Sequence, residues 1–260
     1  MYTAPAMEMN GHRLIGRISS TLRAKQILVL YAIGLFALDI MAPLVAAWLY
    51  RPRPFSEVFA ESGAAFYVFI DAPSAVGAVV IAVSLPAIAW LRCGYIRSIV
   101  GRRHFGPTTA TQFLGMLGVL LITDLVQLGL DGLQRAISPN DWAGMAVGLL
   151  QLGLYLFLLY ADYAVVIGGV DPVTALYRSW QTVRANLTAS LLILVGTTLL
   201  TILIALLIDP RLEGGLGDMI GLFVIRIVAL GMVSFVADVS LIMVYIDSVE
   251  RHAVPAGRRI

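Results

Sequence analysis

Six long apolar runs constrain the fold of this chain more than any other feature of its sequence. A helix of about 20 residues crosses the roughly 30 Å hydrocarbon core of a bilayer, and each run approaches or exceeds that length. Because such runs are too long for ordinary buried helices, the sequence predicts an all-α bundle with six transmembrane helices. The runs are Ile27–Tyr50, Ser74–Val100, Phe113–Leu130, Trp142–Gly169, Leu187–Ile208 and Ile220–Val249.

The composition agrees with a chain embedded in a membrane. Apolar residues make up 59% of the 260 residues and charged residues 13%, whereas about 25% of a soluble domain is charged. No long polar stretch is left for a soluble domain, so we expect one integral membrane domain over residues 1–260. The single cysteine, Cys93, excludes an internal disulfide and a cysteine-based metal cluster.

Basic residues alternate between the connections that join the runs. Thirteen of the 18 Lys and Arg residues lie before the first run, in the second-to-third and fourth-to-fifth connections, or after the sixth run. The count assigns Arg92, Arg97, Arg102 and Arg103 to the second-to-third connection. The positive-inside rule therefore predicts that both termini are cytoplasmic. The first run is longer than the apolar part of a signal peptide, so we expect a retained span. Seventeen arginines against one lysine, with abundant Ala and Gly, indicate a GC-rich bacterial genome and hence a bacterial inner membrane.

Two cytoplasmic segments have the pattern of amphipathic helices that lie in the membrane interface. The segment Arg13–Lys25 directs Leu14, Ile15, Ile18 and Leu22 to one face and its arginines to others. The segment Asp171–Leu187 begins with Asp-Pro, which predicts an aspartate N-cap followed by proline at the first helical position. Its apolar residues recur at helical spacing and are Val173, Leu176, Tyr177, Trp180 and Val183.

Short internal repeats accompany these segments. Arg17–Ala24 and Arg178–Ala185 share four identities in eight positions. Tyr160-Ala-Asp162 is matched by Tyr245-Ile-Asp247, and each copy stands near the predicted inner end of a span. Either a duplicated unit related by an axis along the membrane normal or chance accounts for these matches.

The segment from Tyr160 to Asn186 has an aspartate, a β-branched run and an Ala175-Leu-x-x-Ser179 helix before the next span. Together with the ending Tyr245-x-Asp247 and Arg251, it resembles a largely uncharacterised group of bacterial six-helix membrane proteins. That group is related to the membrane domain of some glycerophosphodiester phosphodiesterases. The resemblance implies the six-helix fold. The phosphodiesterase domain itself, with its catalytic His and Glu pattern, has no counterpart here.

Four ionisable residues inside the predicted spans are candidates for a buried polar site. A charged side chain at the centre of a span costs roughly 2.5–3.5 kcal/mol on insertion scales, so it tends to be paired or functional. By helical rise, Asp124 and Arg226 lie about 9–11 Å inside the outer boundary and have the depth to pair. The site is either a polar cavity, ion path or proton path, or a structural ion pair with protonated or hydrogen-bonded acids. The four residues are Asp39, Asp124, Arg226 and Asp238.

Asp162 and Asp247 stand near the cytoplasmic C-terminal ends of their predicted helices, where a carboxylate opposes the helix dipole. Basic side chains at the same depth are expected to offset this cost by Arg–carboxylate pairs. Such pairs either clamp the interfacial helices or form a gate or substrate site. The expected partners are Arg23, Arg97, Arg178 and Arg184.

Small residues predict close helix contacts at Gly144-x-x-x-Gly148 and Gly217-x-x-x-Gly221, either within the chain or in a homodimer. The small-residue run of the sixth span continues with Gly231, Ser234, Ala237 and Asp238. The three histidines lie outside the spans, and no metal, cofactor or Walker motif is present, so we expect neither enzyme activity nor a cofactor. Dispersed arginines without a soluble platform argue against nucleic acid.

The leading prediction for function is a non-enzymatic membrane scaffold or accessory factor that interacts with anionic lipid headgroups or a protein partner. The alternative is a small-solute or lipid carrier that uses the buried Asp and Arg residues. A water-filled cavity reaching Asp39, Asp124 and Asp238 would favour the carrier, whereas a tightly packed core would favour the scaffold.

Overall fold

The structure is a computed structural model that describes residues 11–38, 75–101, 110–136, 142–208 and 216–253. Every regular element in these ranges is an α-helix, as the sequence predicts. A helical segment, Leu28–Leu38, follows the first helix. The labelled helices are α1 (Gly11–Ala24), α4 (Ala75–Val100), α5 (Ala110–Ala136), α6 (Trp142–Leu158), α7 (Ala161–Gly168), α8 (Pro172–Ala185), α9 (Leu187–Ile208) and α10 (Leu216–Ala253).

Three helices are long and apolar enough to cross a membrane, and they coincide with the fourth, fifth and sixth predicted runs. They are Ala146–Gly168, which joins α6 and α7, then Leu187–Ile208, and Gly221–Arg251 within α10. The second and third runs form the helices α4 and α5, but the apolar part of α5, Ala110–Val126, is shorter. The second half of the first run, residues 39–50, lies outside the described residues.

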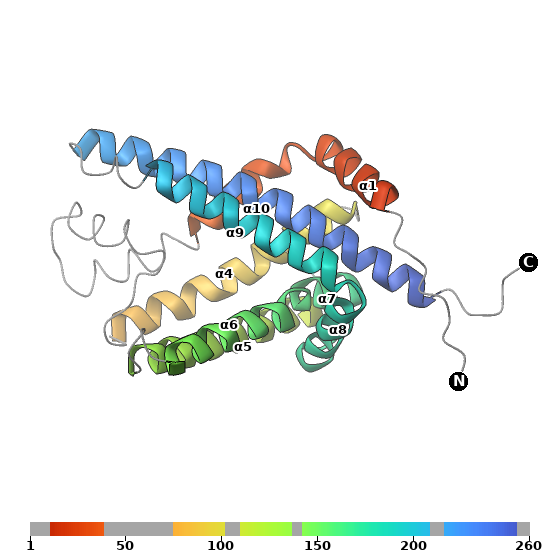
Figure 1. Cartoon of the computed structure of the whole chain (residues 1–260), viewed down its shortest axis with the longest axis horizontal. Coiled ribbons are helices and arrows are strands. Elements are labelled where there is room, and N and C mark those ends of the chain that lie inside the picture. The colour runs from red at the N-terminus through yellow and green to blue at the C-terminus, as the bar shows by residue number, and fades with distance from the viewer. Residues whose placement is uncertain (1–10, 39–74, 102–109, 137–141, 209–215, 254–260) are drawn as a thin grey trace, which may run out of the picture.

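The helices form two groups that meet at one end of the molecule (Figure 1). In one group α9 packs along α10, and in the other α5 packs between α4 and α6. The end where the groups meet, on the right of Figure 1, also holds α7, α8 and α1. Helix α7 contacts α4, α5, α6, α8 and α10, so this short helix joins the two groups.

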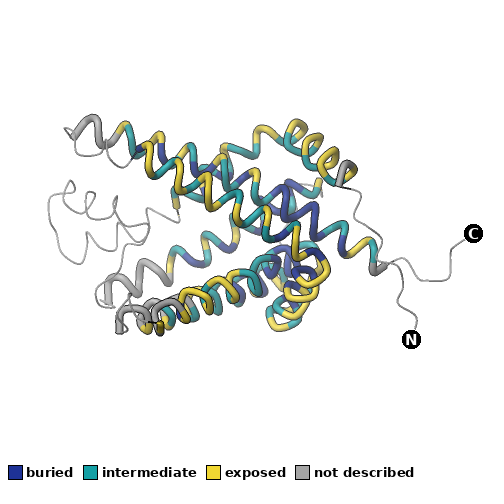
Figure 2. Tube along the Cα trace, in the orientation of Figure 1, coloured by how far each residue is buried: buried dark blue, intermediate teal, exposed yellow. Residues whose placement is uncertain are grey.

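The buried residues gather around α7 (Figure 2). Helix α7 buries Ala161 and every residue from Tyr163 to Val166. Helix α10 contributes the continuous buried run 239–245 to the same core. Packing is therefore concentrated at the end of the molecule that carries α1 and α8.

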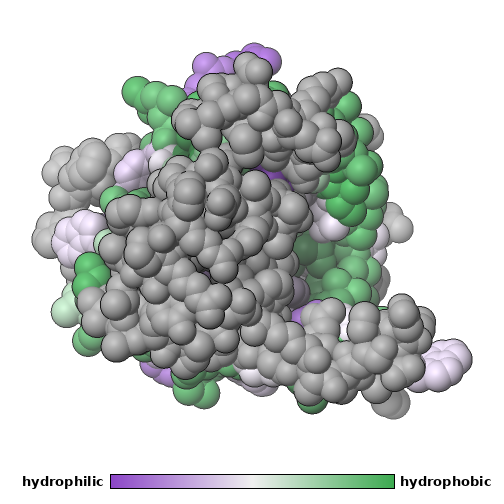
Figure 3. Space-filling view, turned by 90° about the vertical axis from the view of Figure 1, so that its left-hand side faces the viewer, coloured by the Kyte–Doolittle hydropathy of each residue, from purple (hydrophilic) through white to green (hydrophobic). Residues whose placement is uncertain are grey.

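Helix α9 has the opposite character. Its 22 residues include no charged side chain, and Ser190 and Ile208 are its buried residues. Its leucines stay exposed along the whole length, with Leu192 69% and Leu206 67% accessible. Hydrophobic surface of this kind is visible at the right-hand side of the end-on view in Figure 3. Apolar surface of this extent is typical of contact with lipid or a partner.

Helix α1 forms where an amphipathic helix was predicted. Its axis is bent by 87° from the segment Leu28–Leu38, so it lies across the bundle end. Leu14, Ile18 and Leu22 pack against the core, and α1 contacts α10. Ile15 is exposed.

Helix α8 begins as predicted, with proline in its first turn. The side chain of Asp171 accepts hydrogen bonds from the backbone N–H groups of Val173 and Thr174, both at 3.1 Å. Hydrogen bonds from Thr174 hold the pKa of this carboxyl below its usual range.

The predicted apolar stripe of α8 divides between two faces. Val183 is buried against the bundle, beside the small residues Ala175, Ser179 and Thr182. Three members of the stripe face outward instead, because small side chains allow α8 to approach α7 closely. The exposed residues are Val173, Tyr177 and Trp180.

Gly148 and Gly221, one glycine from each predicted motif, make no close helix contact within the described residues. A Cβ atom added to Gly148 or Gly221 would meet no atom within 4 Å. Close contacts occur at Gly231, which the sequence analysis places in the small-residue run of the sixth span, and at Gly118, which it does not name. A Cβ on Gly231 would lie 2.7 Å from the backbone of Ile33, and one on Gly118 would lie 2.7 Å from the ring of Pro172.

Candidate functional site

The site is organised around the break between α6 and α7. The backbone N–H of Tyr160 has left the helical ladder and donates to Ser179 Oγ of α8 at 2.9 Å. The hydroxyl oxygen of Tyr160 lies 2.9 Å from Ser190 Oγ of α9. Because the Ser190 hydroxyl donates to the carbonyl of Asn186, Tyr160 is the donor to Ser190. These bonds satisfy groups that would otherwise be costly inside a bilayer.

Next to this break, four side chains from three helices form a partly buried ionic cluster, in which Tyr163 is buried and the three charged residues are half-buried. Arg92 Nε of α4 lies 2.6 Å from Asp162 Oδ2 of α7. Tyr163 of α7 donates to Asp238 Oδ1 of α10 at 2.6 Å. Arg92 also attracts Asp238 electrostatically, whereas Asp162 repels it. We call Arg92, Asp162, Tyr163 and Asp238 the α7 cluster.

Tyr95 of α4 lies beside the α7 cluster. Its side chain is 1% exposed and interacts with Asp238. Its hydroxyl makes no hydrogen bond of standard length and angle to the described residues. The ring stacks on Tyr31 with centroids 5.7 Å apart. Tyr95 is thus a buried polar group that faces an acid without a standard hydrogen bond.

A second network ties α1 and the α8–α9 junction to the C-terminal end of α10. Arg17 of α1 lies 3.2 Å from Glu250 and 3.9 Å from Asp247. Arg251 pairs with Asp247 at 2.9 Å and donates to Asn186 Oδ1 at 2.6 Å. Because Asn186 is the C-cap residue of α8, this network holds both crossing helices at one end.

Arg178 occupies the C-terminal end of α7. A Cβ on Gly168 would lie 3.0 Å from Arg178 Nη1 and 3.1 Å from the Tyr245 hydroxyl. The glycine leaves room for these two groups, and Gly169 then ends the helix with φ +63°. A guanidinium at a helix C-terminus is favourable to the dipole. The matching arginines of the short repeat, Arg17 and Arg178, both reach the Tyr245-x-Asp247 end of α10.

The partners of the two inner acids differ from those predicted. Asp162 pairs with Arg92, and Asp247 pairs with Arg17 and Arg251. Arg92 was assigned to a connection, but α4 continues to Val100 and carries Arg92 inside the bundle. Among the predicted partners, Arg23 and Arg184 are exposed, Arg97 is half-buried, and Arg178 lies against α7.

The four candidates for a buried polar site do not form one group in the described residues. Asp238 belongs to the α7 cluster, where it meets Asp162 from the other predicted set. Arg226 is buried 12 residues earlier in α10, about 18 Å away along the helix. Asp124 is exposed on α5, and Asp39 lies outside the described residues.

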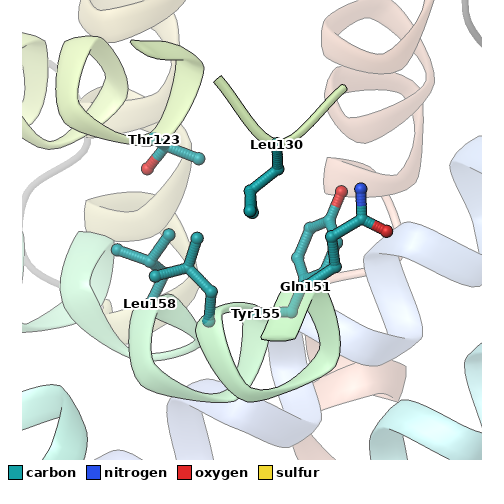
Figure 4. A pocket seen from close by; sticks show the side chains of 6 residues that line it. Thr123, Leu130, Gln151, Tyr155 and Leu158 are labelled. Carbon is teal, nitrogen blue, oxygen red and sulfur yellow. The ribbon is translucent and has the colours of Figure 1, made fainter. Parts of the chain in front are cut away.

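A small cavity opens between α5 and α6 (Figure 4). Its volume is about 20 Å³, which is room for about one water molecule. Neither Asp124 nor Asp238 lines it. The described residues contain no group of three or more His, Cys, Asp or Glu side chains that could hold a metal ion. The lining residues are Thr123, Leu130, Gln151, Leu154, Tyr155 and Leu158.

No family model, curated protein or solved structure matches this chain. The resemblance to the six-helix bacterial membrane proteins therefore stays a prediction. Inferences about function depend on the geometry of the helices and of the α7 cluster.

Proposed function

We propose that the protein is a non-enzymatic scaffold or accessory factor of a bacterial inner membrane, with six spans and cytoplasmic termini. In this proposal α1 and α8 bind anionic lipid headgroups and present the inner face to a protein partner. The observation that carries it is that two crossing helices lie at one end of the bundle and expose both basic and apolar side chains there. Neither helix is free to move away, because Arg17 and Asn186 tie them to α10.

The exposed face of α8 suits the boundary between water and lipid. Tyr177 and Trp180 are exposed, and these residue types are enriched at membrane interfaces because one end is polar and the other apolar. Their neighbours Arg178 and Arg184 are also exposed. The opposite face is packed on α7, so α8 can contact headgroups while it stays part of the bundle.

The exposed basic side chains of α1 and α8 favour anionic lipids. Arg13 and Arg23 of α1 and Arg184 of α8 are exposed, and no ion pair described above uses them. A basic residue near an anionic membrane surface contributes about 1 kcal/mol of attraction. The same residues are the basis for placing this end in the cytoplasm.

The carrier alternative has less support within the described residues. The cavity described above is small, lies between α5 and α6, and is not lined by the buried acids. The α7 cluster instead lies among tightly packed side chains, since Tyr163 is 2% exposed and Tyr95 is 1% exposed.

Lipid retention tests the scaffold proposal directly. The protein is purified from bilayers of equal phosphatidylglycerol and phosphatidylethanolamine, and bound lipids are counted by native mass spectrometry. We expect the triple variant Arg13→Gln, Arg23→Gln, Arg184→Gln to lose its preference for phosphatidylglycerol by at least about tenfold. The matched triple Lys variant keeps the charges and should keep the preference. Equal retention by wild type and the Gln variant would refute the proposal.

Orientation has its own test. A cysteine is placed at Ser19 on α1 or at Asn140 in a Cys93→Ala background, and intact cells are treated with a membrane-impermeant maleimide. We expect labelling at position 140 and protection at position 19, with labelling of both after lysis. The reverse pattern would place α1 and α8 outside the cell.

A further inference from the structure

The α7 cluster holds two carboxylates and one guanidinium beside the packed core, where the side chains of Arg92 and Asp162 are 31% and 15% exposed. Asp162 and Asp238 lie close enough to repel each other, and Arg92 is the basic side chain that attracts both. In a medium of low dielectric, an uncompensated charge is far more costly than in water. Two carboxylates that share one site therefore do not both stay ionised unless a further positive charge joins them.

The closest contacts of the two carboxylates show which of them lacks a neutralising positive charge. Asp162 makes the direct ion pair with Arg92 at 2.6 Å. The contact partner of Asp238 is the neutral hydroxyl of Tyr163. Arg92 acts on Asp238 only through the longer-range attraction described above. The missing positive charge is therefore needed at Asp238.

The buried hydroxyl of Tyr95 is the second observation that points to a positive charge bound at Asp238. It faces Asp238 and makes no standard hydrogen bond to the described residues. If Asp238 carries a proton, its O–H can donate to the Tyr95 oxygen while Tyr163 donates to the other carboxyl oxygen. Both hydroxyls and both carboxyl oxygens then have a partner.

We propose that Asp238 is a half-buried proton-binding site, formed with Tyr95 and Tyr163, that exchanges one proton with the solvent. A metal cation fits less well, because it would lie beside the Arg92 guanidinium and be repelled by it. The groups that face Asp238 are Arg92 and Tyr95 of α4 and Asp162 and Tyr163 of α7. Cys93 and Arg97 lie further out, near Asp162 and Arg92.

Release of the proton would change how α10 is held. The Asp238 carboxylate would then compete with Asp162 for Arg92, so the guanidinium that joins α4 to α7 would be shared with α10. The site thus links the protonation of one residue to the contact between the two helix groups. This inference is independent of lipid binding by α1 and α8, and neither result decides the other.

Infrared spectroscopy of the protein in lipid membranes tests the proposal. At neutral pH we expect the carbonyl stretching band of a protonated carboxylic acid, which shifts in D2O. The band should be absent in Asp238→Asn and unchanged in Asp247→Asn, which removes another acid of α10. In Asp162→Asn, Arg92 is released to pair with Asp238, so protonation should need at least about a tenfold higher proton concentration.

Tyr95→Phe keeps the carboxyl group and separates a binding role from a folding defect. We expect the band to remain but to change frequency, because the hydrogen bond to the Tyr95 oxygen is lost. The proposal is wrong if wild type has no such band at neutral pH, if the band survives in Asp238→Asn, or if Tyr95→Phe leaves its frequency unchanged. A titration midpoint that depends on Na⁺ concentration would also overturn it, in favour of a cation site.

Discussion

Helices α7 and α9 invert the usual relation between burial and polarity. The eight residues of α7 are surrounded by five other helices, yet α7 carries Asp162 and the hydrogen-bonded Tyr163. The 22 residues of α9 are apolar apart from Ser and Thr, yet half of them are exposed and two are buried. In a protein surrounded by water the apolar helix would be buried and the polar one exposed.

This inversion indicates what surrounds each helix. An apolar helix that satisfies its own backbone hydrogen bonds is stable against hydrocarbon without further contacts. A segment with charged and hydroxyl groups needs protein partners, and α7 has them in Arg92, Asp238 and Ser179. Polar contacts hold the centre of the bundle, whereas lipid is expected to cover α9.

The largest expected effect comes from removing the cation at the centre. Arg92→Met leaves Asp162 without its ion-pair partner. Because the side chains of this pair are 31% and 15% exposed, we expect a loss at the lower end of the about 3–5 kcal/mol that breaking a buried pair costs. The free energy of unfolding in mixed micelles, measured by denaturant titration, checks this. The double variant Arg92→Met, Asp162→Leu should be clearly more stable than Arg92→Met alone. Additive losses would show that the two residues do not interact.

A charge at the middle of α9 should have the next largest effect. Leu199 is 60% exposed, so arginine there would be tolerated in water but costs about 2.5–3.5 kcal/mol at the centre of a span. Leu199→Ala is the matched control, with a change of less than about 1 kcal/mol on insertion scales. The insertion efficiency of α9 in microsomes measures both. Equal insertion of the Arg and Ala variants would mean that lipid does not surround this helix.

A smaller effect is expected where α10 meets the segment Leu28–Leu38. In Gly231→Ala the new methyl group lies 2.7 Å from the backbone of Ile33, and overpacking of this kind costs about 1–3 kcal/mol. Gly221→Ala on the same helix meets nothing within 4 Å. It should be neutral or stabilising, because alanine favours helices by up to about 1 kcal/mol over glycine. Thermal unfolding of both variants in the same detergent makes the comparison.

The two glycines also illustrate what could be predicted from the sequence. Helix starts and apolar runs depend on residues near in sequence, so α1, the Asp-Pro start of α8 and the last three runs were predictable. Both Gly221 and Gly231 belong to the small-residue run predicted for the sixth span. Which of them contacts a neighbour depends on where that neighbour lies, and spacing along the helix does not decide it.

The α7 cluster was missed in part for the same reason. Asp162 and Asp238 were assigned to separate sets because they lie in different spans. Their meeting depends on the break at Tyr160, which is held by Ser179 of α8. Arg92 was counted as a loop residue because charged residues commonly end apolar runs. Arg92 lies eight residues before the end of α4, so its guanidinium needs a carboxylate partner within the bundle. This need is the feature of the sequence from which the ion pair could have been predicted.

The smallest effect is expected at the solvent side of α8, where Asp171 caps the helix. Asp171→Ala removes the acceptor for two backbone N–H groups and should lower the melting temperature slightly, whereas Asp171→Asn keeps a good N-cap. Because hydrogen bonds hold the pKa of Asp171 below the usual value of about 3.9, its charged form stabilises the fold fully above that pH. The stability difference between wild type and the Ala variant should be constant near neutral pH and shrink as the pH falls through the lowered pKa. A difference that instead grows on acidification would show that the Asp171 carboxylate does not stabilise the start of α8.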